Sequence, residues 1–357
     1  MLVQPYANNC RTWLSTTLFK EQLMISLTTR IASKLPRPYR LPYWLVLSVL
    51  WLLSVSSATA CTFAAAEVKL PQNSSFNVNT LPESASGITA LGCDGTALSV
   101  LSTPVLNSTI TSTANNLNLK NAAGDLIPYS IYSDPGYNNP IIVGGNINYA
   151  NSNLLTIVLG KIKANLPIYI RTGSNNAINI NISAGTYTDT ISLNWNYDLC
   201  SAVIGVCIGG TFKGTASSTV TVTLVVNNDC VINAAPNVDF GSYALMSQFI
   251  PVNQFITATC TKNATFTTYI TNGDNFSAPW PQMKLLPGSV IPAPPTDYLQ
   301  YQLYQGSGSI PWNITNKRSD TATGSAQQIP YKAMINAQQT QRTVGTYQDN
   351  VSVVLEY

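Results

Sequence analysis

The sequence predicts an all-β protein made of two tandem β-sandwiches, and three observations support this prediction. Charged residues make up only 9% of the chain, and Asn, Thr, Ser, Val and Ile are abundant, which favours pleated sheet over helix. Short alternating apolar runs are bounded by Gly, Pro, Asn or Asp, as in small antiparallel sandwiches with Greek-key connections. Several of these runs occur twice in the same order. We therefore expect two copies of one domain and little helix.

The repeat is defined by three pairs of similar segments. The pairs are 127–132 (IPYSIY) with 299–304 (LQYQLY), 166–171 (LPIYIR) with 329–334 (IPYKAM), and 184–193 (AGTYTDTISL) with 344–353 (VGTYQDNVSV). Three matches in the same order are hard to obtain by chance. They predict a first copy over residues 61–228 and a second copy over residues 229–357.

The N-terminal segment has the pattern of an export signal. An apolar run at 45–53 follows four basic residues between positions 30 and 40, and Ser-Ala-Thr-Ala at 57–60 supplies a small-residue cleavage site. The run is shorter than the roughly 20 residues that a membrane span needs, although a permanent anchor is the alternative. We expect residues 1–60 to be a signal peptide with an N-terminal extension, cleaved before Cys61, with Met24 as a possible start.

Charge argues against a nucleic-acid partner. Removal of residues 1–60 leaves 12 basic and 14 acidic residues, so the positive net charge of +3 belongs to the leader. The chain contains no His, which excludes Ser/His/Asp and Cys/His nucleophile systems and most zinc sites. We expect no enzyme, no metal site and no cofactor.

Five carboxylates keep glycoside hydrolysis open as a chemical possibility, since that reaction needs only a pair of them. They are Asp125, Asp134, Asp189, Asp198 and Asp349. Asp189 and Asp349, however, occupy equivalent places in the two copies. A structural role at the strand edge is therefore the preferred interpretation of that pair.

The cysteines form an even set once Cys10 is removed with the leader, as is typical of an exported protein with disulfides. Six cysteines allow fifteen pairings. The similar long spacings in the two copies and one short spacing favour three of them. The predicted bridges are Cys61–Cys93, Cys200–Cys207 and Cys230–Cys260.

Several of these elements together resemble the spore coat protein U domain family. They are a Cys-led first strand, Asp239-Phe-Gly-Ser-Tyr243, a second Cys, the Leu-x-Tyr-x-Leu-Tyr strand and a closing Gly-Thr-Tyr-x-Asp-x-Val. The family includes subunits of archaic, Csu-type chaperone/usher pili. The resemblance covers residues 230–357 well. It covers 61–197 less well, because the Phe-Gly-x-Tyr element has no clean counterpart there and an extra segment, about 133–165, intervenes.

The resemblance implies immunoglobulin-like sandwiches that lack their last strand. A periplasmic pilus chaperone, and later an adjacent pilin assembled at the outer-membrane usher, supplies that strand in the family. An unfilled groove leaves backbone groups unpaired, so an extended partner is required. In the second copy the alternating strand over 351–355 runs to the last residues of the sequence, and no seventh strand is expected. In the first copy the apolar alternation over 217–227 predicts a last strand supplied by the same chain.

The resemblance also implies a place in the fibre. Shaft pilins of this family carry a donor segment ahead of the first Cys, whereas cleavage before Cys61 leaves none here. Such a subunit receives a strand but gives none. We therefore expect an adhesin exported through the periplasm to the cell surface, at the pilus tip, which attaches to hydrophobic abiotic or host surfaces and supports biofilm formation.

The predicted contact residues are apolar residues in two loops at the far end of the first copy. They are Ala202, Val203, Ile204, Val206 and Ile208, with Ile141, Ile142, Val143, Leu154 and Leu155 beside them. Loops normally carry polar residues, so apolar loops that a disulfide holds suggest a hydrophobic contact surface. The alternative is that these residues close the end of the sandwich core.

Two other functions stay open. A lectin-like tip would stack sugar rings on Trp195, Tyr197, Tyr137 or Tyr149, although these aromatic residues are more simply interpreted as strand and sheet-rim residues. A secreted coat or structural protein without adhesion is the third possibility.

Overall fold

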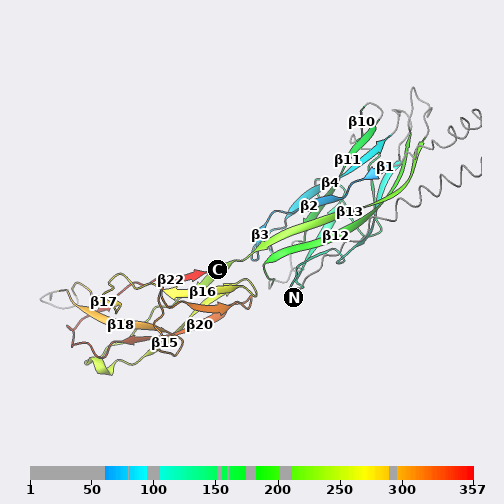
Figure 1. Ribbon diagram of the computed structural model, residues 1–357. Coiled ribbons are helices and arrows are strands. Elements are labelled where there is room, and N and C mark those ends of the chain that lie inside the picture. The colour runs from blue at the N-terminus through cyan, green and yellow to red at the C-terminus, as the bar shows by residue number, and fades with distance from the viewer. Residues whose placement is uncertain are drawn as a thin grey trace, which may run out of the picture. The chain divides into compact units, whose positions relative to one another are not determined.

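The computed structural model describes residues 61–78, 80–94, 105–150, 155–158, 161–173, 182–200, 211–288 and 296–357, and the regular secondary structure in these ranges is almost entirely β-strand (Figure 1). The single helical element among them is a 3-10 turn, η1 (Met246–Gln248). No helix in the described ranges has the length and apolar character that crossing a membrane requires. The predicted signal peptide lies outside the described residues.

The described part of the first copy contains thirteen strands, which form one continuous curved sheet. The strands are β1 (Cys61–Phe63), β2 (Ala66–Lys69), β3 (Asn73–Ser74), β4 (Ser84–Asp94), β5 (Val105–Thr113), β6 (Asn118–Lys120), β7 (Leu126–Tyr132), β8 (Pro140–Ile141), β9 (Asn146–Asn148), β10 (Leu155–Val158), β11 (Lys161–Thr172), β12 (Gly185–Cys200) and β13 (Thr211–Asn227). Their main order is β1-β4-β11-β7-β6-β12-β13-β2, so the β6–β7 pairing joins the two faces that enclose the core.

The longest ladder of the first copy is the antiparallel pair β12 and β13. It runs from Gly185 opposite Val226 to Cys200 opposite Thr211. The strand that alternation predicts over 217–227 is therefore present, and it begins earlier than expected. Val225 on this strand is 37% exposed, whereas four other apolar side chains face the core and are at most 2% exposed. They are Val220, Val222, Leu224 and Val226.

The centre of this core is Trp195 on β12, which is fully buried. Its ring stacks on Phe63 with the ring centroids 4.5 Å apart. Its indole Nε1 donates a hydrogen bond of 2.8 Å to Ser218 Oγ on β13. The indole thus has both an apolar packing partner and an acceptor, as a buried Trp requires.

In its described residues the second copy is a sandwich of a six-stranded and a three-stranded sheet, ordered β14-β15-β20-β18-β17-β21 and β19-β16-β22. The strands are β14 (Cys230–Ala234), β15 (Val252–Cys260), β16 (Thr265–Ile270), β17 (Gln282–Leu285), β18 (Tyr298–Gln305), β19 (Arg318–Thr321), β20 (Gln327–Ile335), β21 (Tyr347–Gln348) and β22 (Val353–Glu356). Between the sheets lies a separate hydrophobic core that includes Trp312, Phe266 and Tyr331. The chain thus consists of two tandem β-sandwiches.

Disulfides occupy equivalent places in the two copies. Cys61 is bonded to Cys93 and Cys230 to Cys260. In each copy the two cysteines are directly opposite one another in the first antiparallel pair of strands. The third predicted bridge, Cys200–Cys207, lies outside the described residues.

Each Gly-Thr-Tyr motif forms a tyrosine corner, in which the phenol bonds to the backbone a few residues upstream. Tyr187 OH donates to the carbonyl of Ser183 at 2.6 Å. Tyr347 OH donates to the carbonyl of Thr343 at 2.7 Å. The repeated sequence motif therefore encodes the same turn in both copies.

Candidate strand-acceptor groove and surface loops

The two copies differ at one sheet edge. The sequence match of 184–193 with 344–353 makes β21 and β22 the counterparts of β12. β12 is covered along its outer edge by β13, whereas β22 pairs with β16 alone within the described part of the second copy. Side-chain burial at this edge also differs between the copies, because Ile191 is fully buried while its counterpart Val351 is 38% exposed. The described part of the second copy therefore contains no counterpart of β13, the last strand of the first copy.

The opposite wall of this gap also lacks a partner. In the first copy β2 pairs in parallel with β13, with Ala66 opposite Val220 and Val68 opposite Val222. The corresponding segment of the second copy, 235–238, has no strand pairing and is exposed or half-buried. Both backbone edges that contact β13 in the first copy are thus open in the second.

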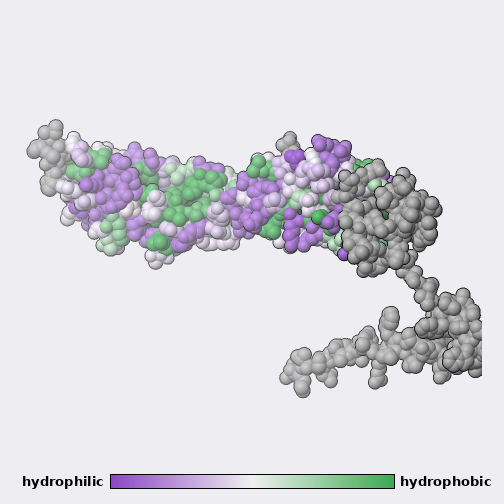
Figure 2. Space-filling view, turned by 90° about the horizontal axis from the view of Figure 1, so that it is seen from above, coloured by the Kyte–Doolittle hydropathy of each residue, from purple (hydrophilic) through white to green (hydrophobic). Residues whose placement is uncertain are grey.

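The gap is a groove with an apolar floor and mixed walls. Side chains from both sheets line the floor, namely Ile256, Ile270, Met283, Tyr301, Leu303 and Tyr331. The walls consist of residues 235–238 and 348–351 with Val353. Figure 2 shows a broad hydrophobic area on the second copy, in the left-hand part of the view, bordered by hydrophilic surface. Unpaired strand edges beside apolar surface are the features that bind an extended peptide.

A hydrogen-bonded tyrosine–aspartate pair, in which the tyrosine is buried, lies at the same place in each copy. Asp349, at the wall of the groove, accepts hydrogen bonds from Tyr301 OH at 2.7 Å and from the Asp274 backbone N–H at 3.0 Å. Asp189 accepts from Tyr129 OH at 2.9 Å and from the Asn115 backbone N–H at 2.9 Å. Burial, together with the neighbouring carboxylate, raises the pKa of both tyrosines. These bonds give both carboxylates a structural role.

Gly273 leaves room for one of these carboxylates. It has a φ of +81°, and a Cβ at this position would lie 2.0 Å from Asp349 Oδ2. Any other residue would therefore displace the carboxylate as well as strain the backbone. The close approach fixes Asp349 where Tyr301 can reach it.

Two further carboxylates hold the tyrosine corners. Asp297 accepts from the Thr343 backbone N–H at 2.8 Å and from Tyr347 OH at 3.1 Å. Burial raises the pKa of Tyr347 to about 12, with the Asp297 carboxylate adding to the shift. Asp125 accepts from the Ser183 backbone N–H at 2.8 Å. Burial alone would raise the pKa of Asp125, but hydrogen bonds from Lys262 and Ser183 lower it to about 2.

Of the predicted apolar contact residues, the structure describes the side chains of Ile141, Ile142 and Val143. Ile141, in β8, is half-buried and packs against the core, whereas Ile142 is 74% exposed and Val143 is 43% exposed. Ile142 and Val143 lie in a tight turn in which the Gly145 N–H donates to the Ile142 carbonyl at 2.9 Å. Residues 202–208 and Leu154 lie outside the described residues, as does the side chain of Leu155 in β10.

The position of this turn differs from the prediction, which placed it at the end of the sandwich. The Gly144 N–H donates to the Ile110 carbonyl at 2.7 Å, and Ile110 is opposite Leu193 in the β5–β12 ladder. Leu193 is seven positions before Cys200, or about 23 Å along a strand. The reason is that β7 ends at Tyr132, which is opposite Tyr169 of β11. Tyr169 is three positions before the last residue of β11, so the loop that follows β7 leaves the sheet at its side.

Three of the four aromatic residues considered for a lectin-like site belong to the core. Trp195, Tyr149 and Tyr197 are at most 5% exposed. Only Tyr137 lies half-buried at the surface. A sugar-binding site made of those four side chains is therefore wrong.

Sequence reasoning missed one wall of the groove. Residues 235–238 carry no strand-like alternation, because the segment that would pair with them is absent from the second copy. Aligning the two copies at Cys61 and Cys230 places this segment against β2, and that comparison could have found it.

Several solved structures are similar to the chain in fold. The tip adhesion subunit in the CsuC-CsuE chaperone-tip pre-assembly complex of Acinetobacter baumannii Csu pili is 21% identical, with 84% of this chain and 100% of that chain covered and a TM-score of 0.48. The CupB6 tip adhesin of Pseudomonas aeruginosa is 12% identical, with 83% and 94% covered and a TM-score of 0.31. The CooA pilin subunit of enterotoxigenic Escherichia coli is 14% identical, with 45% and 90% covered and a TM-score of 0.27.

Sequence comparison identifies the family. No curated protein matches the chain. The model of the Spore Coat Protein U domain matches twice, over residues 48–194 and 216–354. These two matches together cover most of the sequence, the first ending within β12 and the second beginning within β13. The chain therefore belongs to the Spore Coat Protein U domain family.

Proposed function

We propose that the chain is a non-enzymatic tip subunit of a chaperone/usher pilus, in which the first copy contacts surfaces and the second copy accepts a donor strand. The observation that supports this most directly is the difference between the copies. β13 fills the edge of the first sandwich, and the same edge of the second is an open apolar groove. One self-complete domain joined to one strand acceptor fits a subunit that ends a fibre.

The groove needs an occupant during export as well as in the fibre. Its floor is apolar and its two edges present unpaired backbone groups, so an unfilled groove favours aggregation. A periplasmic chaperone supplies the first extended segment. The adjacent pilin then replaces it at the outer-membrane usher, and the subunit reaches the cell surface with a filled groove.

The first copy is a template for how the donor binds. β13 is antiparallel to β12 and places Val220 opposite Ile191 and Leu224 opposite Tyr187. By the sequence match, the donor runs antiparallel to residues 347–356, with apolar side chains opposite Val351 and Tyr347. Near Leu355 the groove accommodates a larger donor side chain than the Ala216 of β13. The reason is that Leu355 occupies the position of the larger Trp195 in the first copy.

The test is to append a turn and a copy of residues 217–227 after Tyr357. In this design the added strand forms a hairpin with β22, as β13 does with β12. We expect the full chain to become monomeric and its second copy to gain at least about 3 kcal/mol in free energy of unfolding, because several aliphatic side chains leave water. Gel filtration and chemical denaturation measure both effects.

The matched control carries the same appended segment with its four inward-facing aliphatic residues replaced by Ser. It has the same length and backbone but no apolar face. Two results would contradict the strand-acceptor role of the second copy. One is equal stability of the two fusions, and the other is a chain that is already monomeric and fully stable without any added strand.

The exposed turn at Ile142 and Val143 is the described part of the proposed contact surface for hydrophobic abiotic or host materials, and hence for biofilm formation. Replacing both with Ser is expected to reduce retention of piliated cells on polystyrene several-fold, since each aliphatic side chain removed from water contributes roughly 1.5–3 kcal/mol. Pilus number on the cells, counted by microscopy, must stay unchanged. The control is Ile88→Ser, which removes an exposed aliphatic side chain from β4. Equal loss with the control, or none with the double variant, contradicts a contact role for the turn.

A further inference from the structure

The loop after β7 is a rigid hook closed by one carboxylate. Asp134 accepts hydrogen bonds from the backbone N–H groups of Gly136 at 3.0 Å and Asn139 at 2.8 Å, and from Asn139 Nδ2 at 3.0 Å. These donors outweigh burial and lower the pKa of Asp134, so the hook stays closed by a charged group. Tyr137, at the tip, has a φ of +55°. A bulky residue adopts that conformation only when its surroundings impose it.

The hook places Tyr137 against two tyrosines of the sheet. Tyr132 on β7 and Tyr169 on β11 are directly opposite one another. The Tyr137 ring is nearly perpendicular to both, at 85° to Tyr132 and 84° to Tyr169, with centroids 5.4 Å and 6.3 Å away. All three rings are half-buried, so each retains surface that faces water. Together they form an aromatic shelf, which we define as Tyr132, Tyr137 and Tyr169.

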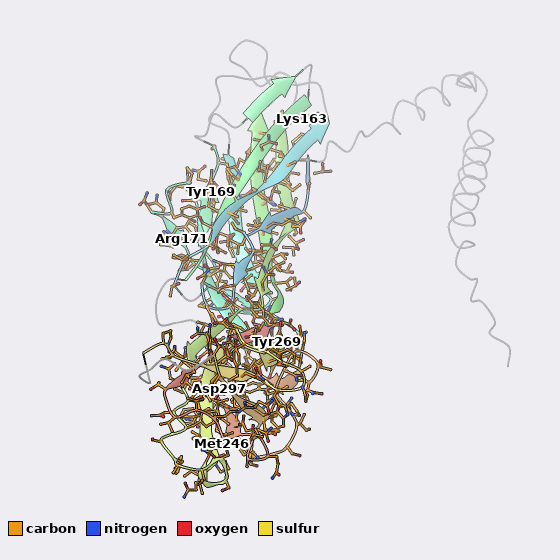
Figure 3. The ribbon with its side chains drawn as sticks, turned by 90° about the vertical axis from the view of Figure 1, so that its left-hand side faces the viewer. Lys163, Tyr169, Arg171, Met246, Tyr269 and Asp297 are labelled. Atoms are coloured by element: carbon orange, nitrogen blue, oxygen red, sulfur yellow. A yellow bond between two sulfur atoms is a disulfide. The ribbon has the colours of Figure 1, made fainter. Side chains whose placement is uncertain are left out.

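A cation without an acid partner lies at the edge of this shelf. The Arg171 guanidinium is 5.8 Å from the centroid of the Tyr137 ring. The structure places no carboxylate within ion-pair distance of Arg171 among the described residues. Figure 3 shows Lys163, Tyr169 and Arg171 in succession along β11, and all three belong to its outward-facing row. An exposed Arg held over an aromatic ring retains its N–H donors for a ligand.

The described outward positions of the sheet beside the shelf carry no acidic side chain. On β4 the residues opposite Tyr169 and Arg171 are Ser86 and Ser84. On β7 the residue opposite Arg171 is Ser130. Small hydroxyl side chains leave the rings accessible and offer hydrogen bonds beside them. The face therefore combines apolar rings, a positive charge and hydroxyl groups.

The second copy shows that this arrangement is not required by the fold. The counterparts of Tyr132 and Tyr169 are Tyr304 and Lys332, which are also directly opposite one another. The Lys332 Nζ lies 5.3 Å from the centroid of the Tyr304 ring and also donates to the Ser307 carbonyl at 3.1 Å. There the cation holds a loop of its own chain. In the first copy Tyr169 occupies the position of Lys332, and Arg171 forms no ion pair with a carboxylate among the described residues.

We propose that the aromatic shelf and Arg171 form a binding site for a carboxylated saccharide. The apolar C–H face of a pyranose ring packs on a tyrosine ring, whose face is electronegative, while the sugar carboxylate accepts paired N–H bonds from the Arg171 guanidinium. Lys163 lies eight positions from Arg171 in the same outward-facing row of β11, about 26 Å along the strand, where it adds a positive charge for a distant unit of a longer saccharide. The site is separate from the strand-acceptor groove and does not depend on pilus assembly.

The test measures binding of defined saccharides to the full chain by calorimetry at 150 mM salt. The ligands are a galacturonic acid hexamer, its fully methyl-esterified form, a sialylated trisaccharide and dextran sulfate. We expect a carboxylated ligand to bind at least about tenfold more tightly than the neutral ester, the value of one charge-assisted hydrogen-bonded contact. The hexamer and the sialylated ligand distinguish a uronic acid from a sialic acid.

Variants locate the site. Arg171→Gln is expected to weaken binding of the carboxylated ligand about tenfold and to leave binding of the methyl ester unchanged. Tyr137→Asn removes the ring while keeping a residue type that tolerates positive φ, and is expected to weaken both ligands. Lys332→Gln, which removes a cation over a tyrosine ring in the second copy, is the matched control and is expected to have no effect.

Three results would overturn the proposal. One is equal affinity of wild type and Arg171→Gln for every carboxylated ligand. Another is a loss of affinity in Lys332→Gln as large as that in Arg171→Gln. The third is dextran sulfate that binds as tightly as the carboxylated ligands. Either of the last two results would indicate attraction to charge alone. Unchanged unfolding midpoints in all variants ensure that lost affinity reports the site and not the fold.

Discussion

Replacing Val222 and Leu224 with Ser is expected to lower the free energy of unfolding of the first copy by about 5–8 kcal/mol. Both side chains are fully buried in β13. Each truncation removes aliphatic contacts, leaves a cavity and places a hydroxyl in an apolar core. Because β13 covers the whole edge of β12, the variant converts the self-complete copy into one that resembles the open groove of the second.

Denaturant titration of the full chain, followed by Trp fluorescence, measures this change, since Trp195 is packed beneath β13. The control is Thr221→Ser with Thr223→Ser, at the half-buried positions that alternate with the two core residues. We expect a change within about 1 kcal/mol for the control. A double core variant as stable as this control would show that β13 is not integral to the first sandwich.

Replacing Asp189 with Ala is expected to cost about 3–5 kcal/mol of folding free energy. Asp189 is only 2% exposed and accepts hydrogen bonds from Tyr129 OH and the Asn115 N–H. Removing the carboxylate leaves these donors unsatisfied in a buried site, at about 1–3 kcal/mol each. Thermal and chemical unfolding of the full chain measure the loss.

A second substitution separates this cause from simple loss of volume. Tyr129→Phe in the Asp189→Ala background removes the orphaned hydroxyl, so the double variant is expected to be more stable than Asp189→Ala alone. If the double variant is instead less stable than Asp189→Ala, by as much as Tyr129→Phe destabilises the wild type, the bond between the tyrosine hydroxyl and the carboxylate does not stabilise the fold. Asp349→Ala, at the equivalent place beside the groove, is expected to cost less, because Tyr301 there borders the open groove.

Much of the fold was predictable because the repeated motifs each impose a local geometry. The alternation of Val220, Val222 and Leu224 encodes burial on one face of a strand, and the structure confirms it. The spacing of Cys61 and Cys93 matches that of Cys230 and Cys260 because each pair joins the first two paired strands of its copy. Equivalent places in the repeat also indicated a structural role for Asp189 and Asp349, which their hydrogen bonds support.

The surface loops were less predictable, for physical reasons. The Ile142 turn is held on β5 through backbone groups of Gly144 and Ile110, and such bonds leave no trace in the side-chain pattern. Its position depends on where β7 ends, which the apolar alternation around Tyr132 does not determine. The aromatic shelf was missed because Tyr132, Tyr137 and Tyr169 come together only through the hook and the register of β7 with β11.

The junction of the two copies has a mechanical consequence. Only two residues separate the end of β13 at Asn227 from the start of β14 at Cys230. The covalent path by which tension on the second copy enters the first therefore runs along β13, parallel to the strand. The backbone bonds to β12 are then sheared together and share the force, instead of opening one after another from an end. The strand that completes the first sandwich is thus also its tether.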